Sequence, residues 1–355
     1  MKGSVRTALG VLLSLVLLWW ALRDVSPEEV LQQIRSADGI LLAFAIVIAL
    51  ATFWIRAFRW GIFLKPVVGP TPLQARVGAT FIGFTFNNLL PARIGEFARA
   101  YSLSRVTGVP VAASFATLVV ERLLDGLVLL GLLFAAMGSA EFPGTSDARI
   151  RSGAMIVALG MVPAIVGLGV AVANPRGAVA FARTVLRPLP DRMGTAVLRI
   201  ARSFGQGLTI LRTPRLFFLA AGLTVFQWSL AALSYLLAFR AFQIDRVPYS
   251  GAVFLQSLMS FAAAPPSSPG FFGPFEAAAR FGLSLWGVPD QQSVSFAIGY
   301  HIAGFIPVNL IGAYYIWRLG LSWSGLRTSE AKVEAYEPVS TVEPGGSGVV
   351  SGDPR

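Results

Sequence analysis

Long apolar runs constrain this chain more than any other feature of its sequence. A helix needs roughly 20 apolar residues to cross about 30 Å of hydrocarbon, and several runs exceed that length. Their hydrophobicity is continuous, which excludes the alternating segments of a transmembrane β-barrel. The sequence therefore predicts an all-α polytopic membrane protein with about six full transmembrane helices, at residues 5–22, 38–64, 111–138, 152–173, 216–243 and 293–319.

Basic residues indicate how these helices are oriented. The net charge is +11, but the basic residues lie in short loops between apolar runs, so we interpret them as an orientation signal and expect no nucleic-acid partner. Residues 174–215 hold eight arginines and one aspartate, which favours the cytoplasmic side. Counting helices outward from this loop places both termini in the cytoplasm of a multi-pass protein of the cell (cytoplasmic) membrane.

The two ends of the domain can also be predicted. The first apolar run follows a basic start, but no small-x-small cleavage site comes after it, and Trp19 and Trp20 are typical of a membrane interface. We therefore expect a retained first helix. Residues 321–355 are rich in Gly, Ser, Pro and Glu, which predicts a disordered cytoplasmic tail after one membrane domain at residues 1–320.

Two further apolar segments, residues 76–105 and 249–286, are broken in the middle. Residues 78–90 would form roughly 20 Å of helix, too short to span a membrane. Asn87 and Asn88 can satisfy backbone groups at its end, and Pro91 suits the first turn of a returning helix. We expect two re-entrant helical hairpins, whose tips lie at a cavity. The second tip would be formed by Ser267, Ser268, Pro269, Gly270, Gly273, Pro274 and Glu276.

The two broken segments resemble each other at an offset of 180 residues. Glu96 aligns with Glu276, and Glu121 aligns with His301. The orientation argument gives the two halves, residues 38–138 and 216–319, opposite directions through the membrane. An inverted-topology repeat with interrupted helices is typical of transporters that bind substrate near the bilayer midplane. Helix starts at that depth favour an anionic group, such as a phosphate.

Charged residues within the first half are candidate ligand-binding groups. Arg93 and Arg99 stand three residues on either side of Glu96, so its carboxylate can lie between two guanidiniums; a structural ion pair at the cytoplasmic mouth is the alternative. Glu121, Arg122 and Asp125 lie near mid-bilayer, where ionisable groups usually have a function. An internally neutralised packing triad is the alternative.

Three other residues have less specific patterns. Arg56 and Arg59 lie near the inner interface among tryptophans, which favours snorkelling to the headgroups over contact with a lipid phosphate. His301 can change its charge near neutral pH or can be a hydrogen-bonded packing residue. The chain has no cysteine and no other histidine, so we expect no metal and no cofactor.

These motifs resemble the lysylphosphatidylglycerol synthase transmembrane family, also called the flippase-like domain family. The residues that carry the resemblance are "NNLLPARIGEFARAYSLSR", "ERLLDGL" and "PPSSPGFFGPFEAAA", and the similarity covers about residues 5–320. It implies a domain that moves a phospholipid or polyprenyl-linked headgroup between leaflets. The soluble aminoacyl-transfer domain of some relatives is not expected here. By motif, the implied site residues are Asn87, Pro91, Arg93, Gly95, Glu96, Glu121, Arg122, Asp125, Pro269, Gly270, Gly273 and Glu276.

Three functions remain open at this point. A lipid flippase, which is not an enzyme, is the leading hypothesis; its partners would be anionic phospholipids or polyprenyl phosphate glycolipids, and self-association stays open. A membrane glycosyltransferase that uses polyprenyl-phosphate sugars is the second, supported by the acidic loop with Asp24, Glu28 and Glu29 but lacking any Asp-x-Asp motif. The third is a non-transporting partner of an envelope enzyme.

Overall fold

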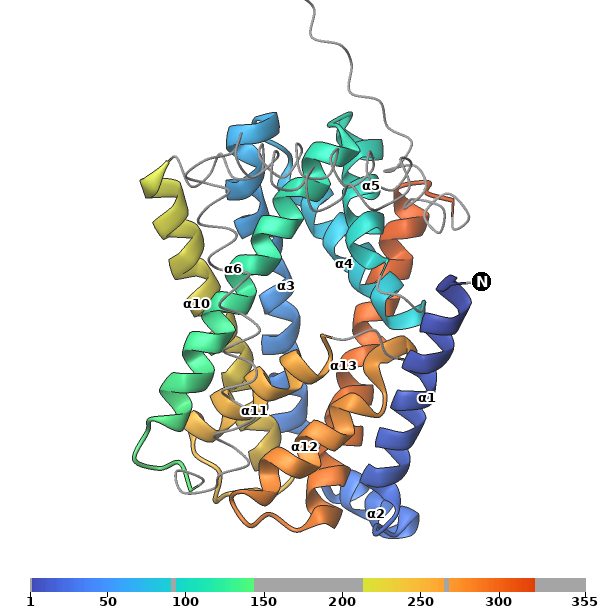
Figure 1. Ribbon diagram of the computed structural model, residues 1–355, viewed down its shortest axis with the longest axis vertical. Coiled ribbons are helices and arrows are strands. Elements are labelled where there is room, and N and C mark those ends of the chain that lie inside the picture. The colour runs from blue at the N-terminus through green and yellow to red at the C-terminus, as the bar shows by residue number, and fades with distance from the viewer. Residues whose placement is uncertain (1, 91–93, 144–212, 265–267, 323–355) are drawn as a thin grey trace, which may run out of the picture.

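Helices make up all the regular secondary structure of the described residues. The computed structural model describes residues 2–90, 94–143, 213–264 and 268–322. Within them the all-α expectation is confirmed (Figure 1). The elements are α1 (Lys2–Leu22), α2 (Pro27–Ser36), α3 (Gly39–Val68), α4 (Leu73–Leu89), α5 (Gly95–Thr107), α6 (Val111–Met137), α10 (Pro214–Ala241), α11 (Tyr249–Ala262), the 3-10 turn η3 (Pro269–Phe271), α12 (Pro274–Ser284) and α13 (Asp290–Arg318).

Three of these helices, α3, α10 and α13, are long and apolar enough to cross a membrane. Gly10–Leu22 of α1 and the adjoining α2 would make a fourth span if counted together, although they are bent by 80°. Helix α6 is nearly as long, with 27 residues, but carries three charges in its middle. The expected helix at 152–173 lies outside the described residues, so the count of six spans stays a prediction.

Helix α2 forms where the sequence predicted only an external loop. It begins with Pro27, which suits a first helical turn, and it has an acidic first turn and Arg35 in its last turn, both favourable to the helix dipole. Only Val30 of this helix is buried, and its mean hydropathy is low. A search for apolar runs therefore misses it.

Both broken segments form pairs of short helices. Helices α4 and α5 have 17 and 13 residues, and α11 and α12 have 14 and 11, all shorter than a membrane span. The helices pack against each other within each pair. In Figure 1 the α4–α5 pair occupies the upper half of the molecule and the α11–α12 pair the lower half, and the break in each pair lies toward mid-height.

The order of helices α3 to α6 recurs in α10 to α13, and each helix of the second set begins 175 to 179 residues after its counterpart. Each set has its own apolar core. Trp60, Phe63 and Leu118 belong to the first core, and Phe239 and Phe296 belong to the second. Helices α3 and α10 contribute to both cores and make the most extensive pair among the described helices. This pair therefore fixes the two sets relative to each other.

Candidate functional site

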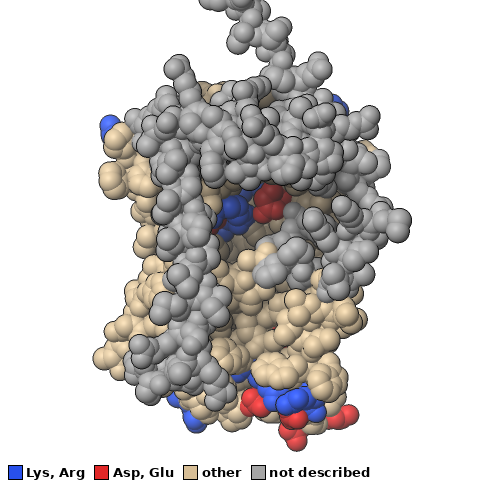
Figure 2. All heavy atoms as spheres, viewed as in Figure 1, with Lys and Arg blue, Asp and Glu red and all other residues tan. Residues whose placement is uncertain are grey.

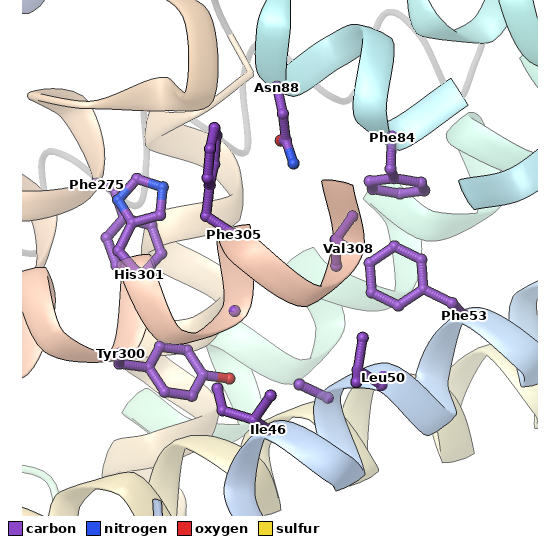
Figure 3. Close-up of a pocket in the computed structure, with 12 residues that line it drawn as sticks. Ile46, Leu50, Phe53, Phe84, Asn88, Phe275, Tyr300, His301, Phe305 and Val308 are labelled. Atoms are coloured by element: carbon purple, nitrogen blue, oxygen red, sulfur yellow. The ribbon is translucent and has the colours of Figure 1, made fainter. Parts of the chain in front are cut away.

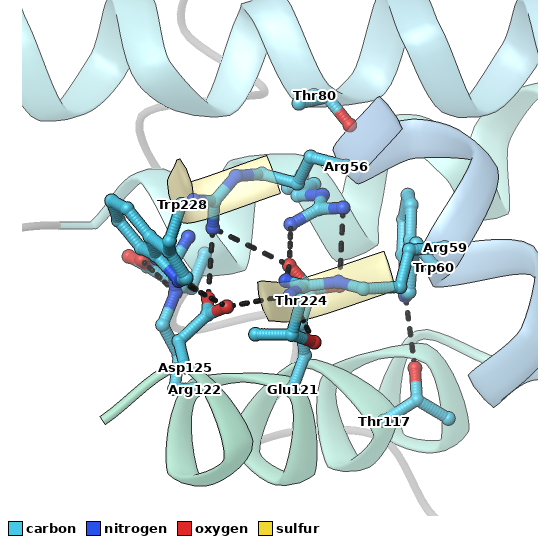
Figure 4. A network of polar contacts seen from close by, with 12 residues as sticks. Arg56, Arg59, Trp60, Thr80, Thr117, Glu121, Arg122, Asp125, Thr224 and Trp228 are labelled. Carbon is cyan, nitrogen blue, oxygen red and sulfur yellow. Dashed lines mark hydrogen bonds and ion pairs between the residues drawn. The ribbon is translucent and has the colours of Figure 1, made fainter. Parts of the chain in front are cut away.

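A cluster of charged side chains lies inside the bundle where α3, α5, α6 and α10 meet (Figure 4). At its centre are two acidic residues of α6, Glu121 and Asp125, which are 0% and 3% exposed. They lie four residues apart and therefore on one face of the helix. Burial of an ion costs several kcal/mol unless partners compensate it. The arginines around these two carboxylates supply that compensation.

Three arginines contact Glu121. Arg99 Nη1 lies 3.0 Å from Glu121 Oε1, Arg59 Nη2 lies 3.3 Å from it, and Arg56 Nη1 lies 3.6 Å from it. Asp125 shares two of these arginines, at 2.7 Å from Arg59 and 3.0 Å from Arg56. The expectation that Arg56 and Arg59 snorkel to the headgroups is wrong. Both are buried, because the two acidic residues of α6 attract them inward.

Uncharged residues of α3 and α10 also contact the charged groups of the cluster. Thr224 Oγ1 accepts a hydrogen bond from Arg59 at 2.6 Å, and Trp228 Nε1 donates one to Asp125 at 3.1 Å. The guanidinium of Arg99 lies 4.2 Å from the centre of the Trp60 ring. Sequence reasoning missed these residues, since neutral side chains on an apolar helix carry no signal of a charged partner on another helix.

The accessible edge of the cluster lies at the α4–α5 break. Glu96 Oε1 lies 3.3 Å from Arg122 Nε, and Glu96 Oε2 accepts a hydrogen bond from Asn87 at 3.3 Å. The other end of the Asn87 amide accepts a bond from Gly95 N–H at 2.9 Å, which ties α4 to α5. The side chains of Arg122 and Glu96 are 35% and 23% exposed. Figure 2 shows charged atoms of both signs at the floor of a hollow in this face.

A pocket of about 170 Å³ adjoins the cluster (Figure 3). Its lining is mostly apolar and aromatic, and Asn88, Tyr300 and His301 contribute polar groups. The ring of Phe84 connects the two sites: it lines the pocket and lies 5.3 Å from the Arg56 guanidinium and 5.7 Å from that of Arg122. The full lining is Ile46, Ala49, Leu50, Phe53, Phe84, Asn88, Phe275, Tyr300, His301, Gly304, Phe305 and Val308.

His301 lies in the pocket wall that belongs to the second set of helices. Its Nδ1 is 2.7 Å from Glu276 Oε1, and Glu276 Oε2 accepts the Gly273 N–H at 2.6 Å. The rings of Phe272 and Phe275 lie 4.4 Å and 4.3 Å from the imidazole. His301, which aligns with Glu121 at the offset of 180 residues, thus has a carboxylate partner, whereas Glu121 is paired with arginines.

Glu276 and Arg280 lie four residues apart on α12, a spacing that predicts an ion pair, but each of them has other partners. Arg280 Nη2 instead lies 2.8 Å from Asp24 and 2.5 Å from Asp290, and its Nη1 donates to the carbonyl oxygen of Trp20 at 2.6 Å. Because Glu276 points toward α13 and Arg280 toward the end of α1, the two side chains diverge on α12. Arg280 therefore ties α12 to α1 and to the start of α13.

The turn before α12 holds the remaining predicted residues. Ser268 N–H donates a hydrogen bond to Ser14 Oγ of α1 at 2.8 Å, so this turn packs against the first helix. Pro269 and Gly270 belong to η3, and Gly270 and Gly273 have φ values of 71° and 100°, which L side chains rarely adopt. Glycine is therefore required by the backbone at both positions.

The structure brings most of the predicted site residues together in two groups. One correction concerns Glu96: Arg99 contacts Glu121 rather than Glu96, because its position about one turn further along α5 places it opposite the buried carboxylate of α6. Pro91, Arg93 and Ser267 lie outside the described residues. The first group holds Arg56, Arg59, Asn87, Gly95, Glu96, Arg99, Glu121, Arg122 and Asp125, and the second holds Asn88, Gly273, Glu276 and His301.

A family model for the lysylphosphatidylglycerol synthase TM region matches residues 7–312. The chain belongs to this family. Together with the apolar helices, membership identifies a multi-pass membrane protein. The expectation from the motifs is confirmed at the level of the family.

Two curated relatives of this family member differ in length. Glycosyltransferase AglD of Haloferax volcanii is 28% identical over 295 residues, which cover 76% of this chain and 47% of that protein, so the chain spans about half the length of AglD. A UPF0104 membrane protein of Methanothermobacter thermautotrophicus is 22% identical over 324 residues, covering 89% of this chain and 93% of that protein. No solved structure matches the chain.

Proposed function

We propose that this protein is a lipid flippase, which moves a lipid with a phosphate-containing headgroup between the two leaflets. The observation that carries the proposal is a charged cluster inside a membrane protein, next to an aromatic pocket. In the described part of the cluster, four arginines face three carboxylates, which leaves one positive charge in excess. An anionic headgroup offsets that charge, and the adjoining pocket can hold another part of the same molecule.

The arrangement of helices supports transport rather than static binding. The α4–α5 and α11–α12 pairs lie in opposite halves of the molecule, and the helix order recurs at about the spacing of the sequence repeat. We interpret them as re-entrant hairpins of an inverted repeat within six membrane spans. Rocking of one half against the other would open the headgroup site to each side in turn. Both termini would then lie in the cytoplasm.

Arg122 is the cluster residue best placed to meet a headgroup. It is the most exposed of the four arginines: 35% of its side chain is accessible, against 6% or less for the other three. A charge-assisted hydrogen bond contributes about 1.5–3 kcal/mol, and 1.4 kcal/mol corresponds to about a tenfold change in rate. We therefore expect Arg122→Gln to slow lipid transfer by about tenfold or more.

Proteoliposomes with fluorescent phosphatidylglycerol and a membrane-impermeant quencher measure this transfer. The matched control is Arg105→Gln, at the exposed end of α5, which should transfer lipid at the wild-type rate. The flippase proposal would be contradicted if lipid transfer were equally fast in three samples: protein-free liposomes, liposomes with wild type and liposomes with Arg122→Gln. The comparison covers phosphatidylglycerol and other anionic lipids.

The name of AglD favours a second candidate, a glycosyltransferase that uses a polyprenyl-phosphate sugar. Its base would come from the acidic residues after α1. The structure makes Asp24 a weak base, since hydrogen bonds from Arg280 and Arg23 hold the pKa of its carboxyl below the usual range. Glu28 accepts a hydrogen bond from Ser26 at 3.2 Å.

A triple variant tests this candidate. The variant changes Asp24 to asparagine and both Glu28 and Glu29 to glutamine, which removes the acidic groups of this region. We expect sugar transfer from a radiolabelled polyprenyl-phosphate sugar to be at background in wild type and variant alike. Transfer by wild type that the triple variant loses would instead establish the transferase function.

A further inference from the structure

The sole histidine of the chain presents one ring nitrogen to the pocket. His301 lines the pocket and is 10% exposed, and no described residue makes a hydrogen bond with its Nε2. Its other nitrogen, Nδ1, is held by Glu276. The proposed transport path therefore has a polar group at the pocket wall formed by α12 and α13, on a different helix from the arginine cluster.

Glu276, Phe272 and Phe275 hold the ring of His301 in place. Glu276 is fully buried; its Oε2 accepts the Gly273 N–H, and its Oε1 lies 2.7 Å from Nδ1 of the imidazole. Where the neutral ring donates Nδ1–H to this carboxylate, Nε2 keeps a lone pair. Phe272 and Phe275 pack against the ring and fix its orientation. Nε2 is thus a positioned acceptor.

A hydrogen-bond acceptor selects a different part of a headgroup from an arginine. Nε2 repels a phosphate oxygen but accepts a bond from a hydroxyl group. Asn88, at the end of α4, points into the same pocket and can both donate to and accept from a hydroxyl (Figure 3). Phosphate suits the arginines on the other side of Phe84, so the two sites fit two parts of one headgroup.

We infer that His301, positioned by Glu276, recognises a hydroxyl group on the headgroup whose phosphate lies at the arginine cluster. The inference rests on the proposed function and narrows its substrate to phosphate esters that carry free hydroxyls. A glycerol headgroup and a phosphate-linked sugar both combine a phosphate with free hydroxyl groups. Lipids that carry phosphate without a headgroup hydroxyl do not.

The single histidine allows a direct test on the full-length wild-type protein. The chain is labelled with ¹⁵N-histidine and purified without a polyhistidine tag, so that every ring signal belongs to His301. NMR spectra are recorded in nanodiscs of phosphatidylcholine alone and with added phosphatidylglycerol, phosphatidic acid or polyprenyl-phosphate glucose. We expect an unprotonated Nε2 in phosphatidylcholine, and a shift of this signal with at least one hydroxyl-bearing lipid but not with phosphatidic acid.

Each outcome decides the inference. A shift with phosphatidylglycerol only assigns a glycerol headgroup, and a shift with the glucosyl lipid only assigns a sugar. A protonated Nε2 in phosphatidylcholine, equal shifts with phosphatidic acid and phosphatidylglycerol, or no shift with either hydroxyl-bearing lipid overturns it. These signals do not depend on transport, so the flippase proposal can fail or stand separately.

Two variants separate recognition from folding. Glu276→Gln supplies an amide that can donate to Nδ1, which moves the proton of His301 to Nε2, so the Nε2 signal in phosphatidylcholine should become that of a protonated nitrogen. His301→Phe keeps a flat ring between Phe272 and Phe275 but removes the nitrogen. It should slow phosphatidylglycerol transfer by about tenfold and leave phosphatidic acid transfer unchanged. Tyr314→Phe, on the exposed side of α13, is the matched control.

Discussion

Replacing Glu121 by glutamine is expected to lower the free energy of unfolding by about 3–5 kcal/mol and to stop lipid transfer. Glu121 is fully buried and lies within 3.6 Å of Arg56, Arg59 and Arg99. Among the described residues, its removal leaves Asp125 as the one carboxylate between these arginines, so more of the buried positive charge is uncompensated. Equilibrium unfolding in mixed detergent micelles measures the loss.

A double variant distinguishes charge imbalance from a simple packing defect. Arg99 contacts Glu121 with both of its terminal nitrogens, so Arg99→Gln removes the partner that Glu121→Gln leaves unpaired. The double variant should lose less free energy of unfolding than the two single variants lose together, and the difference should be about 0.5–3 kcal/mol. Glu29→Gln, an exposed site on α2, should change stability by less than about 0.5 kcal/mol. If Glu121→Gln is as stable as the wild type, Glu121 and its arginines are not ionised as described here.

The helix breaks could be predicted from the sequence because their causes are local. Prolines and a pair of asparagines interrupt apolar runs that are too short to span, and these breaks fall where α4 and α11 end. Helix α6 was predicted within one residue of its ends because a continuous run follows Pro110 and a glycine follows Met137. Local chemistry was sufficient in these cases.

The partners of charged residues could not be predicted, since they depend on how distant helices pack. Spacing on one helix indicated the contact between Arg122 and Asp125, which lie 3.6 Å apart. It gave no sign that Arg59 of α3 reaches Asp125 of α6, or that Arg280 reaches Asp24, 256 residues earlier. The composition of "FWIRAFRW" suits a membrane interface as well as a buried cluster. Only the acidic face of α6 shows why Arg56 and Arg59 are buried.

The close contact between α4 and α5 gives the second large effect, at Gly95. A Cβ atom there would lie 2.6 Å from the Asn87 amide oxygen and closer still to the carbonyl oxygen of Gly83. Gly83 is equally confined, since its own Cβ would lie 2.7 Å from the Gly95 carbonyl oxygen. Backbone on both sides cannot give way without separating the two helices. Gly95→Ala is therefore expected to destabilise the protein by about 1–3 kcal/mol.

This expectation opposes helix propensity, which makes it a sharp test. Alanine favours a helix over glycine by about 1 kcal/mol, so propensity alone predicts that Gly95→Ala stabilises. Gly131→Ala in α6 is the matched control, because a Cβ there meets nothing within 4 Å, and it should be neutral or slightly stabilising. Thermal unfolding of the two variants in one detergent compares them directly.

Lipid transfer should fall only in Gly95→Ala, since separating α4 from α5 breaks the Asn87 bond and moves Arg99 away from Glu121. Equal behaviour of the two variants would mean that α4 and α5 do not pack this closely.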